Sequence, residues 1–291
     1  MIYLTLILTT LFWGGTFIAG RVLADSVAPA DAAFMRFVLA AVTLAVLTRM
    51  IDGRLRLPPR DQLVSLLLLG LTGVFCYNIC FFSGLRYIEA GRASLIIALN
   101  PMAITVGAVF LFGERLSLLQ CAGLLISLFG AFLVISNGNP AILISGGIGW
   151  GEIAILGCVI SWAAYSLIGR NVLKSMSPLS AVFYSALFGA LMLFPATLVG
   201  EAPLQIHTYS SADWISLLFL GILGTAAGFS LYYQAIRAIG SARSSVFINL
   251  VPLFSILLAW IFLGETINFS VLGGGIILMS GVYLTNKKAK T

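Results

Sequence analysis

The sequence predicts an all-α polytopic membrane protein with ten transmembrane helices, arranged as two inverted five-helix repeats around a central cavity. Two observations lead to this prediction. First, hydrophobic residues make up 60% of the chain and charged residues only 9%, whereas a soluble domain carries about 25% charged residues. Second, the second half of the sequence repeats the first.

The repeat is visible in residues that apolar composition alone would not align. From Gly70 to Leu133 the sequence aligns without a gap on residues 221–284, and 16 of the 64 aligned pairs are identical. Shared apolar composition explains matching Leu and Ile residues but not matching Arg, Pro and Glu residues. Upstream, the offset is 149 residues. The aligned pairs include Trp13 with Trp162, Arg86 with Arg237, Pro101 with Pro252, and Gly113-Glu114 with Gly264-Glu265. A tandem duplication in a membrane protein is typical of transporters.

Apolar stretches of about 20 residues recur along the chain, and about 20 helical residues cross a hydrocarbon core of about 30 Å. We expect ten spans, which begin near Ile2, Ala30, Leu63, Ala93, Ser117, Gly149, Leu179, Trp214, Ser244 and Phe269. The breaks between them predict a first repeat at residues 1–137, a linker at 138–148, a second repeat at 149–286 and a basic tail at 287–291. Five is an odd number, so the repeats must be inverted relative to each other.

The distribution of Lys and Arg predicts the orientation. With ten spans, both termini lie on one side of the membrane. That side receives twelve of the basic residues and the opposite side three, while Arg36 falls inside the second span. Both termini are therefore expected in the cytoplasm, and the net charge of +6 belongs to a cytoplasmic rim rather than to a nucleic-acid site.

The titratable residues argue against several classes of function. All ten Asp and Glu residues fall in loops or within two turns of a span end. Proton-coupled transporters commonly carry a carboxylate in mid-membrane, so transport without proton coupling is expected, although half-helix carbonyls remain able to bind an ion. The sequence also lacks the acid pairs, metal-binding motifs and catalytic histidine of an enzyme. We therefore expect no catalytic residue, metal site or cofactor.

Polar and aromatic side chains recur at membrane depth on equivalent helices of the two repeats. Indole, phenol and amide groups in a bilayer need partners, either neighbouring helices or a wet cavity. The alternative interpretation is helix packing, but the repetition favours a shared pathway. The predicted substrate-binding residues are Trp13, Phe17, Tyr77, Asn78, Phe81, Asn100, Trp162, Tyr165, Tyr232 and Asn249.

Two further pairs are candidates for helix kinks or gating. Pro101 and Pro252 are expected to bend their helices and free a backbone carbonyl for substrate, or else to act as structural kinks. Glu114 and Glu265 are expected to cap the next helix, with a gating pair to an arginine as the alternative. Small residues on the fifth and tenth spans, at Gly123, Ser127, Ala131, Gly274 and Gly281, predict a packing surface or a homodimer surface.

These motifs resemble those of the EamA-type drug/metabolite transporter superfamily. The resemblance covers the whole chain and is carried by Leu11-Phe12-Trp13-Gly14, Phe34-Met35-Arg36-Phe37, Asn100-Pro101 and the two Gly-Glu pairs. It implies a ten-helix, basket-like fold and export of small metabolites across the bacterial inner membrane. The abundant aromatic residues make the chain similar to the aromatic amino-acid exporters of that superfamily. In the second repeat Arg36 is replaced by Ser185 and Asn100 by Val251, so roles for these two positions apply only to the first half.

The sequence thus predicts an exporter of small metabolites, most specifically neutral or aromatic amino acids, that works by alternating access. An ion-coupled exporter of other drugs or metabolites is one alternative. A channel is another, but a channel usually needs a ring of equivalent groups, and one inverted repeat supplies at most a two-fold constriction. A membrane enzyme is disfavoured, because the sequence lacks the acid pairs, metal-binding motifs and catalytic histidine that an enzyme would use. The expected partners are a small-molecule substrate and the lipid bilayer.

Overall fold

The structure, a computed structural model, describes residues 1–24, 26–53, 57–85, 87, 96–114, 116–135, 149–199, 206–263 and 269–286, and these contain helices but no strand. The α-helices are α1 (Ile2–Ala24), α2 (Pro29–Ile51), α3 (Leu63–Leu69), α4 (Tyr77–Leu85), α6 (Asn100–Phe112), α7 (Leu118–Ile135), α9 (Trp150–Val172), α10 (Pro178–Val199), α11 (Ser211–Leu218), α12 (Gly228–Ile239), α13 (Ser241–Ser245), α14 (Leu250–Leu263) and α15 (Phe269–Asn286). Shorter 3₁₀ and π segments are η1 (Arg60–Gln62), η2 (Gly70–Cys76), η3 (Ile206–Thr208), η4 (Phe219–Ala227) and η5 (Val246–Asn249).

The composition of these helices is that of a multi-pass membrane protein. Within the described part of the chain, seven helical stretches are long and apolar enough to cross a bilayer, and three apolar helices are shorter. The shorter three are Asn100–Phe112, Leu118–Leu133 and Leu272–Asn286. The predicted linker at 138–148 and basic tail at 287–291 lie outside the described residues.

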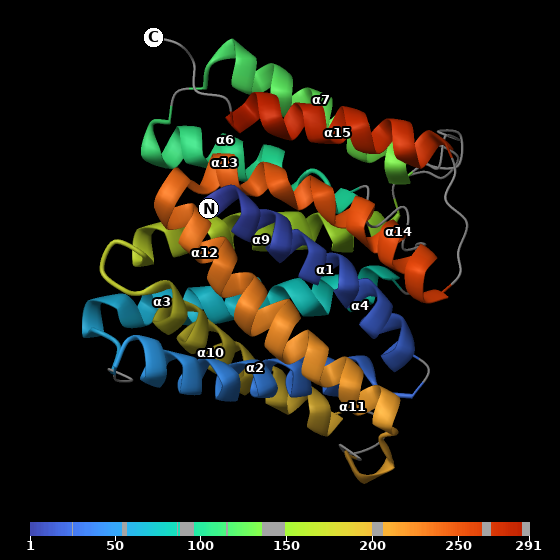
Figure 1. The fold of residues 1–291 in the computed structure, drawn as a ribbon. Helices are drawn as coiled ribbons and strands as arrows, with labels where there is room; N and C mark the ends of the chain where they lie inside the picture. Colours follow the sequence, from blue (N-terminus) through green and yellow to red (C-terminus); the bar gives the residue numbers. More distant parts are fainter. Residues whose placement is uncertain are drawn as a thin grey trace.

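The helices form a bundle with a helix pair at each edge (Figure 1). α7 packs on α15 at one edge, α2 packs on α10 at the other, and α1, α4, α9 and α12 lie between them. α1 contacts α12 and α14, while α9 contacts α4 and α6. The sequence repeat aligns α1 with α9, α12 with α4 and α14 with α6. The contacts that α1 makes with α12 and α14 therefore correspond to those that α9 makes with α4 and α6.

Two of the long helices contain a π segment, and the two segments lie at repeat-equivalent positions. η2 begins at Gly70, and η4 includes Gly221, which lies 151 residues later. A π segment shifts the backbone hydrogen bonds by one residue and often marks a functional site. The glycines allow close helix contact here: a Cβ atom on Gly73 would lie 2.1 Å from Tyr165, and one on Gly224 would lie 2.8 Å from Thr16. The sequence pattern did not predict this π geometry.

The two prolines do not kink a helix in the predicted way. Pro101 lies in the first turn of α6, and Pro252 is the third residue of α14, directly after the 3₁₀ segment η5. The first N–H groups of a helix have no intrahelical partner, so proline costs little at such a position. The helices are therefore interrupted before the prolines, and each proline begins a new helical segment.

The small residues of α7 and α15 face each other inside one chain. A Cβ atom on Gly281 would lie 2.2 Å from the backbone nitrogen of Ser127, and one on Gly130 would lie 2.3 Å from the backbone nitrogen of Leu278. Small residues let two membrane helices approach this closely. The stripe is therefore a packing surface within the chain, and a homodimer would have to use another face.

We expect Gly281→Ala to lower the free energy of unfolding by about 1–3 kcal/mol, because the added methyl group meets backbone atoms of α7 that have no rotamer to change. Gly273→Ala is the matched control on the same helix, since nothing lies within 4 Å of its added Cβ atom. That variant should be neutral or slightly more stable, because alanine is the better helix former. Thermal unfolding of both purified variants checks the difference, and equal stabilities would contradict the packing of α7 on α15.

Candidate functional site

The centre of the bundle is occupied by an aromatic cluster, defined as Trp13, Tyr77, Phe81, Trp162, Tyr165, Phe229, Tyr232 and Tyr233. Its rings come from α1, α4, α9 and α12, so both sequence repeats contribute. The rings of Trp13 and Trp162, which the repeat aligns, meet edge to face with centroids 5.4 Å apart. Trp162 also contacts Phe229 at 5.1 Å. Edge-to-face contacts of this kind are the favoured geometry for aromatic pairs.

The polar ends of the cluster are held by the surrounding helices. Trp13 Nε1 donates a hydrogen bond of 3.0 Å to the carbonyl oxygen of Gly224 in η4. The hydroxyl groups of Tyr232 and Ser166 lie 3.2 Å apart, and Tyr233 donates to the carbonyl oxygen of Tyr165 at 3.1 Å. Because buried indole and phenol groups are costly without partners, these bonds orient the rings. The π segment of the second half is thereby tied directly to the first helix.

Six of the ten predicted substrate-binding residues lie in this cluster, namely Trp13, Tyr77, Phe81, Trp162, Tyr165 and Tyr232. Phe17 packs against the main hydrophobic core on α1. Asn78 is buried and donates to the carbonyl oxygen of Val74, one turn earlier in its own helix, at 2.6 Å. Phe229 and Tyr233 belong to the cluster but were absent from the predicted set. Both residues lie on the same helix as Tyr232, Phe229 three positions before it and Tyr233 directly after it. This proximity in sequence was the signal that could have added them to the predicted set.

Two of the predicted asparagines lie elsewhere. Asn249 is fully buried, and its Nδ2 donates to Ser127 Oγ on α7 at 3.1 Å. This hydrogen bond joins η5 to the α7–α15 pair. Asn100 is 2% exposed, and its Oδ1, like that of Asn249, has no hydrogen-bond partner. The structure therefore gives Asn249 a contact between helices and leaves two buried amide oxygens unpaired.

The aromatic rings fill the place where a central cavity was expected. Trp13 and Trp162 are 8% and 6% exposed, and Tyr165 is fully buried. A pocket of about 430 Å³ lies instead at the end of α12, within the usual size range of a small-molecule site. It is lined by Ile51, Asp52, Ser177, Pro178, Leu179, Gln234, Arg237 and Ala238. The structure thus combines a closed centre with an open pocket at one end of the bundle.

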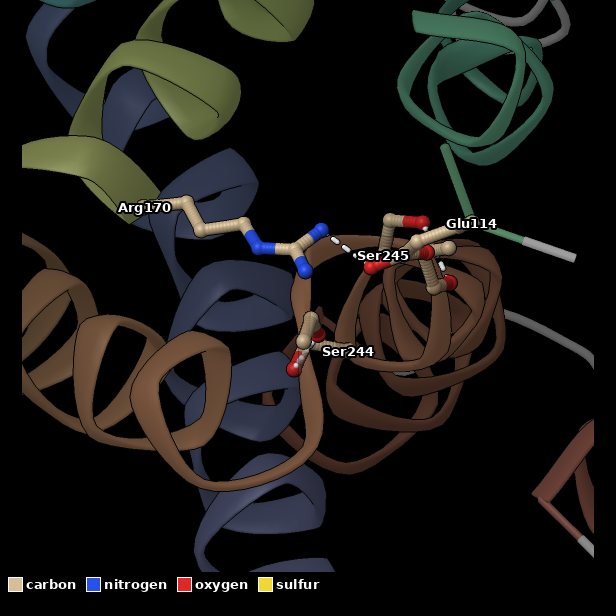
Figure 2. A network of polar contacts seen from close by, with 6 residues as sticks. Glu114, Arg170, Ser244 and Ser245 are labelled. Atoms are coloured by element: carbon tan, nitrogen blue, oxygen red, sulfur yellow. Dashed lines mark hydrogen bonds and ion pairs between the residues drawn. The ribbon is translucent and has the colours of Figure 1, made fainter. Parts of the chain in front are cut away.

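An ion pair joins the ends of α6 and α9 (Figure 2). Gly113, at a φ angle of +63°, ends α6 in the left-handed conformation, and Glu114 follows it. Figure 2 shows Arg170 of α9 reaching toward Glu114 past Ser244 and Ser245 of α13. The guanidinium of Arg170 also lies 4.2 Å from the ring centroid of Phe112.

Glu114 therefore does not cap the next helix as predicted. Ser117 and Gln120 make the hydrogen bonds at the start of α7: the Ser117 N–H donates to Gln120 Oε1 at 3.0 Å, and the Gln120 N–H donates to Ser117 Oγ at 3.3 Å. Glu114 instead pairs with Arg170 and so joins α6 to α9, near Gly240, at the end of the bundle where α12 ends. Its repeat partner Glu265 lies outside the described residues.

Comparisons with known proteins agree on one family. The sequence profile of the EamA-like transporter family matches twice, at residues 1–136 and 149–287. The chain is 29% identical to a probable terminal-alkyne amino-acid exporter of Streptantibioticus cattleyicolor, over 97% of this chain and 92% of the relative. It is 26% identical to a probable amino-acid metabolite efflux pump of Escherichia coli, over 96% and 92%. A protein of known crystal structure shares the fold with a TM-score of 0.80, at 21% identity, over 98% of this chain and 96% of that chain. The chain therefore belongs to the EamA-like transporter family.

Proposed function

We propose that this chain exports small neutral amino acids, aromatic ones in particular, across the bacterial inner membrane by alternating access. The observation that carries the proposal is the aromatic cluster, in which both halves of the family fold place rings at the centre of the bundle. Aromatic pairs contribute about 0.5–1.5 kcal/mol beyond area burial, which suits a site that must release its substrate. Two relatives named as an amino-acid exporter and an amino-acid metabolite efflux pump support the same substrate class.

The proposed architecture is ten spans in two inverted repeats with both termini in the cytoplasm. It is supported by the helix contacts, which are equivalent in the two halves of the chain, and by the family profile, which matches each half once. α1 begins and α15 ends at the same end of the bundle (Figure 1). Arg49, Arg170 and Arg237 lie at or near helix ends on that side, as the charge bias of a cytoplasmic face requires.

The proposed cycle separates the rings of the aromatic cluster. In the structure the centre is closed and the Glu114–Arg170 pair joins α6 to α9. Rocking of the two halves would part Trp13 from Trp162 and expose the space between them to one side at a time. The pocket at the end of α12 lies next to this route, because the same helix carries Tyr232, Tyr233 and Arg237.

The cycle is proposed to run without proton coupling. Among the described residues, the buried acids Asp31, Glu152 and Asp213 each lie in the first turn of a helix. A carboxylate is stabilised there by the helix dipole and is poorly placed to carry a proton through the membrane centre. Ion-coupled export of other drugs or metabolites is the second candidate, since family members named only as transporters leave the substrate open.

Counterflow tests the proposed function. Proteoliposomes loaded with unlabelled L-phenylalanine should accumulate labelled L-phenylalanine transiently. The initial rate should saturate as the external L-phenylalanine concentration rises, because a carrier completes one conformational cycle for each substrate molecule that it moves. Glucose loaded in its place should give no accumulation. A linear, non-saturating flux of both solutes would identify a channel and contradict the proposal.

A further inference from the structure

A cationic side chain, Arg36, lies beside the aromatic cluster and has no carboxylate partner among the residues that the structure describes. Arg36 is the eighth residue of α2, about 10 Å along the axis from the start of that helix. Its Nε donates a hydrogen bond of 2.7 Å to Thr225 Oγ1 in the π segment η4. Thr225 is fully buried and in turn donates to the carbonyl oxygen of Leu220 at 2.9 Å. The guanidinium is thus held by one edge against the core of the second half.

The other edge of the guanidinium has donors to spare. Arginine carries five N–H donors, and the bond to Thr225 uses the one on Nε. In the described part of the chain, no Asp or Glu forms an ion pair with Arg36. The residue as a whole is partly buried, and no other hydrogen bond of its guanidinium is seen within the described part of the chain. Charged groups inside membrane proteins are costly and are almost always paired or functional.

The surroundings of Arg36 connect it to the aromatic cluster. Its guanidinium lies 5.3 Å from the ring centroid of Phe37, and that ring is 6.4 Å from Phe229. An anion bound at the free edge of Arg36 would therefore have the cluster next to it.

We propose that Arg36 binds the α-carboxylate of the transported amino acid, while the side chain of that amino acid contacts the aromatic cluster. This inference rests on the proposed function and adds the group that recognises the carboxylate. The planar guanidinium fork matches a carboxylate in a bidentate pair. The hydrogen bond to Thr225 leaves the two terminal nitrogens free for that pair, because it uses only the Nε edge.

The site is single because the repeat is asymmetric at both positions. The residue aligned with Arg36 is Ser185, and its hydroxyl group lies 3.3 Å from the hydroxyl group of Tyr165. The residue aligned with Thr225 is Val74, which has no side-chain acceptor. A two-fold framework with one cation at this position would hold one carboxylate, in one orientation, on the side of the cluster where Phe37 contacts Phe229.

The test compares compounds that differ only in the carboxylate. In proteoliposomes, L-phenylalanine should inhibit counterflow of labelled L-phenylalanine roughly 10- to 100-fold more strongly than L-phenylalaninamide does, since hydrogen bonds to charged groups have about this effect on affinity. Arg36→Gln should abolish that difference, and Arg36→Lys should keep part of it. Arg49→Gln is the control, because Arg49 lies at the exposed end of the same helix. It should retain the full difference.

The outcomes separate the two proposals. If the wild-type protein shows no counterflow, the proposed function is wrong and the carboxylate site is withdrawn with it. If wild-type counterflow is normal but Arg36→Gln still prefers the acid to the amide, the assignment of Arg36 alone is wrong. A purely structural role would lower the amount of folded protein without changing this preference.

Binding to the wild-type protein provides a readout that does not depend on the folding of any variant. In lipid nanodiscs, 3-phenylpropionate retains the carboxylate and should raise the melting temperature, whereas phenethylamine lacks it and should not. Stabilisation by phenethylamine alone would overturn the assignment.

Discussion

Replacing Trp162 by alanine is expected to abolish counterflow and to lower the free energy of unfolding by about 3–5 kcal/mol. The ring of Trp162 contacts five other rings, those of Trp13, Tyr77, Tyr165, Phe229 and Tyr232, at centroid distances of 5.1–5.9 Å. Lipid tails are as apolar as these side chains, so the loss comes from packing contacts that no neighbour replaces rather than from exposure to water.

The matched control is Trp150→Ala. Trp150 is 65% exposed in the first turn of the same helix, and its removal should change neither transport nor stability by a measurable amount. Trp162→Phe keeps an aromatic ring and is expected to recover folding while altering the preference among aromatic amino acids. Undiminished flux in well-folded Trp162→Ala protein would remove the aromatic cluster from the transport pathway.

Glu114→Gln is expected to lower the free energy of unfolding by about 1–3 kcal/mol, because it leaves the charge of Arg170 without its partner. The two side chains are 23% and 26% exposed, so solvent reduces the effect below that of a fully buried pair. Arg170→Gln should cost a similar amount. The double variant should cost less than the sum, since the two residues act through one contact.

Transport by Glu114→Gln distinguishes the two roles that the sequence left open. A structural tie predicts that transport falls only in proportion to the amount of folded protein. If the variant kept its expression and melting temperature but lost counterflow, the pair would act as a gate, and the structural interpretation would be wrong. Arg243→Gln serves as a control, since it removes a basic residue of α13, next to Ser244, that is not part of the Glu114–Arg170 pair.

The membrane fold and the family could be predicted from the sequence because both depend on local signals. Long apolar stretches specify spanning helices wherever they occur, and most of the described helices begin within a few residues of the predicted positions. The EamA resemblance is confirmed by the family match across the chain. The sequence repeat also aligned Trp13 with Trp162 and placed both in the predicted set, and their ring centroids lie 5.4 Å apart.

The remaining features depend on contacts between helices far apart in sequence. The π segments arise where Gly73 and Gly224 meet other helices closely, and no hydropathy pattern contains that information. Asn249 was predicted to face substrate but bonds to Ser127, because an amide in a membrane helix has no preference for a cavity over a neighbouring helix. Glu114 bonds to a residue 56 positions away, whereas capping is a local pattern that sequence analysis favours. The hydrogen bond between Arg36 and Thr225 could not be predicted either, because the two residues are 189 positions apart in the sequence.

The most direct test of the proposed mechanism is amino-acid uptake by proteoliposomes with and without a pH gradient. An uncoupled alternating-access carrier should show counterflow of L-phenylalanine at the same rate in both conditions, and a pH gradient alone should not concentrate the amino acid. Concentrative uptake driven by the pH gradient in the absence of an amino-acid gradient would contradict uncoupled transport and would require a proton-carrying group within the bundle.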